Sequence, residues 1–95
     1  MKVEVARRGG FAGIALHAAV DTAELSSGVA GEAEAALGKL EFDRPPSPPR
    51  HPDGFQYAIT VTDGETRRSV VLDEAEVPAG LRPVVEAAMA RGEPG

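Results

Sequence analysis

A proline-rich stretch divides this 95-residue chain into two halves. Five prolines lie between residues 45 and 52, and each lacks the backbone N–H that a helix or an inner strand requires. We therefore expect residues 44–53 to form an extended, polyproline-like loop. Neither half is long enough to build a core of its own, so residues 1–95 should fold as a single domain.

The first half begins with two runs in which apolar and polar residues alternate. Val3 and Val5 alternate with charged or small residues, and a second run extends from Ile14 to Val20. Alternation with a period of two is typical of half-buried strands. The glycine-containing residues 9–13 separate the two runs, which predicts a β-hairpin with a longer loop.

The second half begins with another alternating pair, Phe55–Thr62 and Glu65–Leu72. The dipeptide Asp63-Gly64 between them favours a two-residue hairpin turn. With these two residues in the turn, Ile59 would lie opposite Arg68. One face of the pair is apolar and the other is polar or small, so the second face should be solvated.

Each half ends in a helical pattern, in which apolar residues recur every three or four positions. In the first half these are Leu25, Val29, Ala33, Leu37 and Leu40, preceded by the candidate N-caps Asp21, Thr22, Ser26 and Ser27. In the second half the pattern predicts a helix from Leu81 to about Arg91, after which residues 92–95 should fray. The order ββαββα predicts an α+β fold, with a four-stranded antiparallel sheet and two helices packed on one face.

Composition and charge exclude several classes of function. The formal net charge is −5, whereas nucleic-acid binding needs a basic face. No run of 18 apolar residues could span a membrane, and the N-terminus lacks the apolar segment of a secretory signal, so we expect a cytoplasmic protein. The absence of cysteine excludes disulfides, thiol catalysis and zinc–thiolate sites. Sixteen of the apolar residues are alanine, which leaves only a thin core and no room for a buried large cofactor.

The remaining polar residues assemble neither a metal site nor a catalytic site. The two histidines are His17 and His51, and although Asp53 is near His51, no third ligand lies at a compatible spacing. No serine lies on a G-x-S-x-G turn, and the carboxylates of residues 73–76 are better explained as an acidic connector. We therefore expect no metal, no cofactor and no enzymatic activity.

Two loops are the candidate partner-binding segments. Phe11 is a large apolar residue among glycines, and it either folds back over the sheet or is an exposed anchor for a partner. The proline-rich loop is the second candidate, because a stiff segment loses less entropy when it docks. The candidate residues in and beside these loops are Arg8, Gly9, Gly10, Phe11, Ala12, Gly13, Arg50 and His51.

Two arginine doublets and the sheet edges are further candidate contact features. Arg7-Arg8 and Arg67-Arg68 should be solvated, and at the same end of the sheet they would meet acidic groups on a partner. We expect a monomer, with an exposed edge strand as the route by which two copies could pair.

Several segments together resemble the emfourin family, small bacterial proteins named for an inhibitor of protealysin. Arg8-Gly9-Gly10-Phe11-Ala12-Gly13 after the first strand is similar to the signature of that family. The similarity continues in Asp53-Gly54-Phe55-Gln56-Tyr57, in the Asp63-Gly64 turn, and in Val71-Leu72-Asp73-Glu74, which leads to Val77-Pro78 and Leu81-Arg82-Pro83-Val84-Val85. It covers nearly the whole chain in the same order.

The resemblance implies an inhibitor of thermolysin-like zinc metallopeptidases that acts inside the cell. Because the chain has no cysteine and no histidine cluster, we expect it to block the active-site cleft with surface loops without chelating the zinc. Such enzymes prefer bulky apolar residues beside the cleaved bond, so Phe11 could occupy the main specificity pocket. The alternative is a small interaction or structural domain with no protease target, and a small hydrolase is a third option.

Overall fold

The computed structural model describes residues 1–9, 15–42 and 54–94. In chain order, the elements of these residues are β1 (Lys2–Gly9), β2 (Leu16–Asp21), the 3-10 turn η1 (Thr22–Glu24), α1 (Ser27–Gly38), β3 (Phe55–Asp63), β4 (Thr66–Asp73), the 3-10 turns η2 (Glu74–Glu76) and η3 (Ala79–Leu81), α2 (Arg82–Arg91) and β5 (Glu93–Pro94). The expected α+β fold with the order ββαββα is confirmed, and β5 is an additional short strand.

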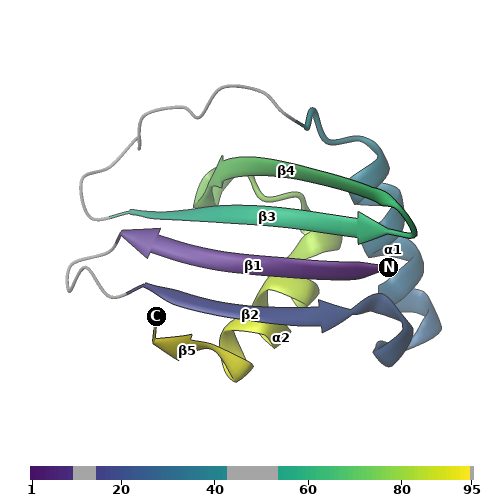
Figure 1. The fold of residues 1–95 in the computed structure, drawn as a ribbon, viewed down its shortest axis with the longest axis horizontal. Helices are drawn as coiled ribbons and strands as arrows, with labels where there is room; N and C mark the ends of the chain where they lie inside the picture. Colours follow the sequence, from purple (N-terminus) through teal and green to yellow (C-terminus); the bar gives the residue numbers. More distant parts are fainter. Residues whose placement is uncertain (10–14, 43–53, 95) are drawn as a thin grey trace.

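The strands form one antiparallel sheet in the order β4-β3-β1-β2-β5 (Figure 1). Both predicted hairpins are present, and β1 joins them by pairing with β3. The N-terminal strand therefore lies in the middle of the sheet, where Val3 and Val5 are each only 1% exposed. Alternation predicted the buried face of β1, but the strand order comes from the tertiary structure alone.

The turn between β3 and β4 differs from the predicted one. Asp63 pairs with Thr66, so the two turn residues are Gly64 and Glu65 rather than Asp63-Gly64. Gly64 has φ +61°, and hairpin turns favour glycine at this first turn position. Moving the turn by one residue shifts each partner by two positions, so every side chain keeps its face. Ile59 consequently lies opposite Val70 instead of Arg68, which places two buried apolar side chains together.

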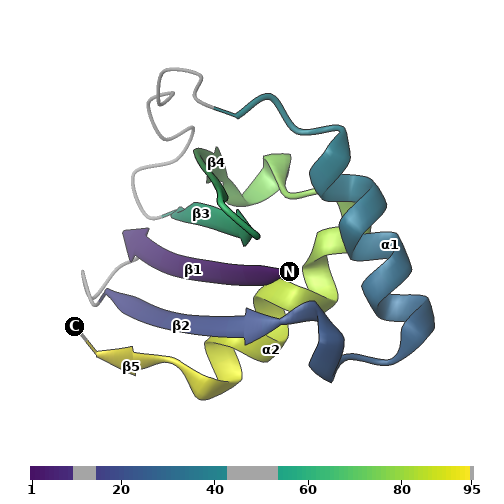
Figure 2. The same cartoon turned by 45° about the vertical axis from the view of Figure 1, so that its right-hand side comes forward.

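Both helices lie on one side of the sheet (Figure 2). Helix α2 contacts β1 and β2, whereas α1 contacts α2, η1 and η3. The buried apolar residues from the strands, the helices and their connectors are Val3, Val5, Val20, Ala33, Leu37, Ile59, Val61, Val70, Leu72, Val77, Leu81, Val84, Val85 and Ala88. The core is thus a single layer between one sheet face and the helices, as the small number of large apolar residues led us to expect.

Helix α1 begins after Ser26, one of the four candidate N-caps, and a separate 3-10 turn precedes it. The side chain of Asp21 caps η1 by accepting from the N–H of Ala23 (3.0 Å), and Ser26 caps α1 by accepting from the N–H of Val29 (3.4 Å). Two of the four candidate N-caps therefore act in succession. Leu25 lies between the two helical segments and is packed against the core.

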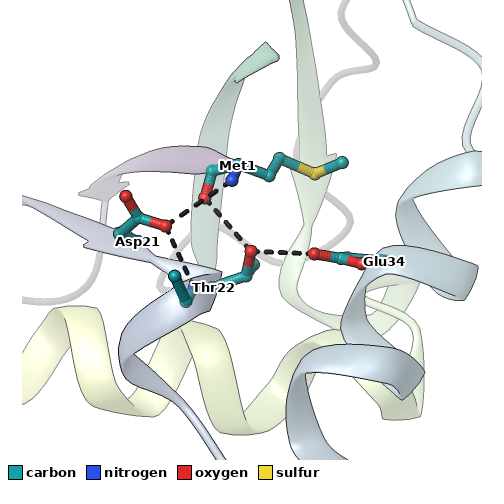
Figure 3. Close-up of polar contacts among 5 residues, drawn as sticks. Met1, Asp21, Thr22 and Glu34 are labelled. Atoms are coloured by element: carbon teal, nitrogen blue, oxygen red, sulfur yellow. Dashed lines mark hydrogen bonds and ion pairs between the residues drawn. The ribbon is translucent and has the colours of Figure 1, made fainter. Parts of the chain in front are cut away.

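A polar cluster ties the first helical segment to the N-terminal strand (Figure 3). Thr22 is 2% exposed, and its Oγ1 donates to Oε2 of Glu34 on α1 at 2.9 Å. The N–H of Thr22 donates to the carbonyl oxygen of Met1, also at 2.9 Å. The Met1 amino group lies 3.5 Å from Oδ1 of Asp21. These contacts hold the start of β1, the end of β2 and the middle of α1 together.

The C-terminal residues form part of the sheet rather than fraying as expected. Glu93 and Pro94 of β5 pair with His17 and Leu16 of β2. Just before β5, Arg91 donates from Nη1 to the carbonyl oxygen of Ala19 (3.4 Å). The exit of α2 beside β2 makes this pairing possible, and no local sequence pattern signals it. None of the described helices is long and apolar enough to cross a membrane.

Candidate functional site

Of the predicted partner-binding residues, the structure describes only Arg8 and Gly9. Arg8 and Gly9 form the end of β1, with both residues exposed. Gly10, Phe11, Ala12, Gly13, Arg50 and His51 lie outside the described residues, so the two alternatives for Phe11 both stay open. The described residues that flank the two segments nevertheless fix where each segment begins and ends.

The first candidate segment begins and ends at the end of the sheet at which the proline-rich segment ends, whereas the proline-rich segment begins after Phe42, close to Met1 and Asp63 at the other end. Gly9, the last residue of β1, pairs directly with Phe55, the first residue of β3 (Figure 1). The chain therefore leaves β1 next to the point at which it enters β3. Leu16, which opens β2, pairs with Arg7 at the same end. Gly9 and Phe55 are 46 positions apart in the sequence (55 − 9), and their pairing holds one end of each candidate segment side by side.

Gly9 has a backbone conformation that other residues rarely adopt. Its φ is +90°, and a Cβ built on it would lie 2.6 Å from the carbonyl oxygen of Gly54. Real Cβ atoms essentially never approach a backbone oxygen so closely, and the positive φ adds further strain. Glycine is therefore required at position 9, where the chain leaves β1 and passes Gly54.

Arg7 is not the solvated residue that the doublet Arg7-Arg8 suggested. It follows Val3 and Val5 on the helix-covered side of the sheet, and its guanidinium carbon lies 4.3 Å from the centre of the Phe55 ring. This cation–π contact joins β1 to the start of β3. The Nε atom of Arg7 is buried and has no hydrogen-bond partner among the described residues. The alternation of β1 predicts this face for Arg7, because Arg7 is two residues after Val5, whereas the doublet pattern alone does not separate Arg7 from Arg8.

The two arginine doublets do not gather at one end of the sheet. Arg67 lies opposite Thr62, which pairs with Lys2 at the start of β1, whereas Arg8 lies at the other end of β1. Arg67 and Arg68 are exposed, as expected. Of the four arginines, only Arg8 is an exposed guanidinium next to the candidate segments.

A hollow of about 310 Å³ lies on the helix-covered side close to this end of the sheet. Its lining residues are Tyr57, Glu74, Ala75, Val77, Arg82, Val85 and Glu86. Two carboxylates and one guanidinium line it, so its surroundings are acidic overall. Asp73, at the end of β4, is buried and caps η2 in a capping box with Glu76. The acidic residues 73–76 therefore form a capped connector, in agreement with the sequence analysis, and the hollow beside it was not anticipated.

Catalytic and metal-binding groups are not brought together in the described part of the chain. His17 is exposed on β2, and His51 lies outside the described residues. No group of three or more His, Cys, Asp or Glu side chains could hold a metal ion among the residues with described positions. The hydroxyl groups of Thr60 and Ser69 are hydrogen-bonded to each other at 3.0 Å across β3 and β4, on the face opposite the helices.

A comparison with protein families decides the classification. The sequence model of the Emfourin family matches residues 5–89, which include Gly9, both candidate segments, helix α1 and most of helix α2. The chain belongs to the Emfourin family. No match was found among curated proteins or among solved structures.

Membership of the Emfourin family suggests a protein of the protease-inhibitor type with a metallopeptidase as its partner. A non-enzymatic role is consistent with this family. The matched range begins within β1 and ends before β5, so it contains the end of the sheet at which Gly9 pairs with Phe55.

Proposed function

We propose that this Emfourin-family chain inhibits thermolysin-like, specifically protealysin-like, zinc metallopeptidases by blocking their active-site cleft with surface loops. The observation that carries the proposal is the pairing of Gly9 with Phe55. This pairing places the start of residues 10–14 beside the end of residues 43–53, so a single partner can meet both segments there. A cleft between two lobes is a concave surface that loops starting or ending at this end of the sheet would enter.

The anchoring of this end favours inhibition over cleavage of the loops. There is no space for a side chain at Gly9, because a Cβ there would overlap the carbonyl oxygen of Gly54. The contact between Arg7 and Phe55 also links β1 to β3, the strands from which the two loops extend. Loops that are fixed at their strand ends lose less entropy when they dock, and a loop whose peptide bonds do not reach the geometry that hydrolysis requires would resist cleavage. Phe11 would serve as the apolar anchor in the specificity pocket, and Arg8, Arg50 and His51 are further candidate contact residues.

The proposal includes the fate of the metal, the compartment and the oligomeric state. Inhibition proceeds without chelating the zinc, since the chain has no cysteine and its described residues offer no group of metal ligands. The inhibitor acts in the cytoplasm and as a monomer. Fractionation of the native cells and size-exclusion chromatography of the purified protein test the last two statements.

The decisive experiment is a titration of the purified chain against thermolysin and against a protealysin-like peptidase, with cleavage of a fluorogenic peptide as the readout. We expect complete inhibition at a stoichiometric ratio of at least one of the two enzymes, with the zinc still bound when the complex is isolated. Loss of zinc from the enzyme would refute occlusion as the mechanism. No inhibition of either enzyme would favour the alternative, an interaction domain without a protease target, and peptide cleavage by the chain alone would favour a hydrolase.

A further inference from the structure

The sheet face opposite the helices has no second layer within the described residues (Figure 2). Three alanines, Ala6, Ala19 and Ala58, lie on this face in the three central strands β1, β2 and β3. Together with Glu4, Arg8, His17 and Thr60 they line a shallow hollow of about 400 Å³, which we call the open-face hollow. The hollow exists because Ala6 lies opposite both Ala58 and His17, so no large apolar side chain fills the centre.

Of the two charged side chains at the rim of the open-face hollow, Glu4 has ion-pair partners and Arg8 has none among the described residues. Glu4 lies 3.4 Å from Nζ of Lys2 and 3.6 Å from Nη2 of Arg67, so its carboxylate is shared between two cations. Arg8 has no hydrogen bond or ion pair in the part of the chain that the structure describes. On a chain whose formal net charge is −5, this is an exposed guanidinium available to an external carboxylate.

We infer that the open-face hollow is a second contact surface for the metallopeptidase, which places an apolar side chain over the alanines and a carboxylate on Arg8. The inference rests on the proposed function. Arg8 directly precedes Gly9, so the hollow is continuous with the segment proposed to enter the cleft. A stable protein complex buries about 800 Å² on each partner, so a partner that covers the loops extends onto adjoining surfaces.

Charge complementarity favours this side of the sheet over the other. The hollow on the helix-covered side carries the two carboxylates of Glu74 and Glu86 against the single guanidinium of Arg82, so its net negative charge would repel an acidic partner group. On the open face Arg8 is the charge nearest to the loops, and the small side chains let a partner approach the strands closely. The partner surface that fits is therefore an acidic rim with one protruding apolar residue, next to the cleft of the enzyme.

Two variants of the open face and two matched controls test this inference. Ala58→Trp fills the hollow, and Arg8→Glu reverses the charge at its rim. Ala35→Trp and Arg82→Glu make the same changes at exposed positions on α1 and α2. We expect the inhibition constant for the peptidase to rise at least 10-fold for both open-face variants and to stay unchanged for both controls. The effect of Arg8→Glu should diminish as salt is added.

Ala58→Trp is the decisive variant. Arg8 flanks the proposed inhibitory loop as well as the hollow, so a loss of inhibition in Arg8→Glu would not distinguish the two surfaces. Thermal unfolding of each variant shows whether it is folded, and Ala19→Gln, at an exposed position of β2, is the second filling variant if Ala58→Trp does not fold. If a folded filling variant inhibits as strongly as the unchanged chain, the open face is not part of the interface, although the proposed function still holds. If the unchanged chain inhibits neither peptidase, both proposals are refuted.

Discussion

Replacing Gly9 by alanine tests the geometry at the candidate site most directly. The new Cβ would lie 2.6 Å from the carbonyl oxygen of Gly54, and the backbone at φ +90° would be strained by any side chain. A residue that has to leave glycine-only conformational space costs about 1–3 kcal/mol, and the backbone shift that relieves the overlap adds to this. We therefore expect Gly9→Ala to lower the free energy of unfolding by at least about 2 kcal/mol.

Urea denaturation followed by circular dichroism measures this change. With a slope of about 1–2 kcal/mol per molar urea for a domain of this size, the midpoint should fall by about 1–2 M. Gly28→Ala is the matched control, since Gly28 lies in α1 and a Cβ there would meet nothing within 4 Å. Alanine is the better helix former, so Gly28→Ala should raise stability by about 0.5–1 kcal/mol.

The two substitutions therefore have opposite expected signs. If Gly9→Ala were as stable as the unchanged chain, the tight passage of β1 past Gly54 would not exist, and the reasoning about the anchored loops would fail. If Gly9→Ala has a higher inhibition constant than the unchanged chain under conditions in which the variant is still folded, this backbone geometry is linked to function.

Three further predictions concern binding and stability. Phe11→Ala should weaken inhibition by at least about 2 kcal/mol in a titration, with little change in melting temperature; unchanged inhibition with a lower melting temperature would place Phe11 in the core. Thr22→Val should cost about 1 kcal/mol in thermal unfolding, because the 2.9 Å hydrogen bond from Oγ1 to Glu34 is lost, whereas a neutral effect would show that the hydrogen bond does not stabilise the fold. The pKa of Asp21 is lowered from its ordinary value of 3.8, first by the hydrogen bond from the N–H of Ala23 and also by the Met1 amino group. The ionised carboxylate of Asp21 therefore stabilises the fold fully above pH 3.8, and this stabilisation is lost as the pH falls through the lower pKa of the folded state. Asp21→Asn removes the titrating group, so the free energy of unfolding of this variant should depend less steeply on pH in the acid range. An unchanged acid dependence would contradict this.

The candidate site was only partly predictable from the sequence. A phenylalanine among glycines and a stiff proline-rich loop identified the two segments, because both features are local. Their common anchor could not be derived, since the pairing of Gly9 with Phe55 depends on β1 lying beside β3. The hollow above Ala6 and Ala58 was equally hidden, because these alanines become neighbours only through that pairing.

The hairpin turn shows where a local pattern is overruled. Asp63-Gly64 is a common turn dipeptide, but the structure uses Gly64 and Glu65. The observed register places Ile59 opposite Val70 and Tyr57 opposite Leu72 on the buried face, while Val61 lies opposite the exposed Arg68 nearer the turn. The pair of Ile59 and Val70, both buried under the helices, contributes to this register, whereas in the predicted register Ile59 would have met the charged Arg68.

The sequence by itself determined which segments are strands and helices, which faces are buried, and that the chain builds one thin core. These properties follow from the period of the apolar residues and from the conformations that proline and glycine allow, and both act over a few residues. The tertiary structure alone decided the order β4-β3-β1-β2-β5, the addition of β5, the position of Arg7 on Phe55 and the meeting of the two loop anchors. Such contacts join distant parts of the chain, and they are selected by how well the whole set of elements buries its apolar faces together.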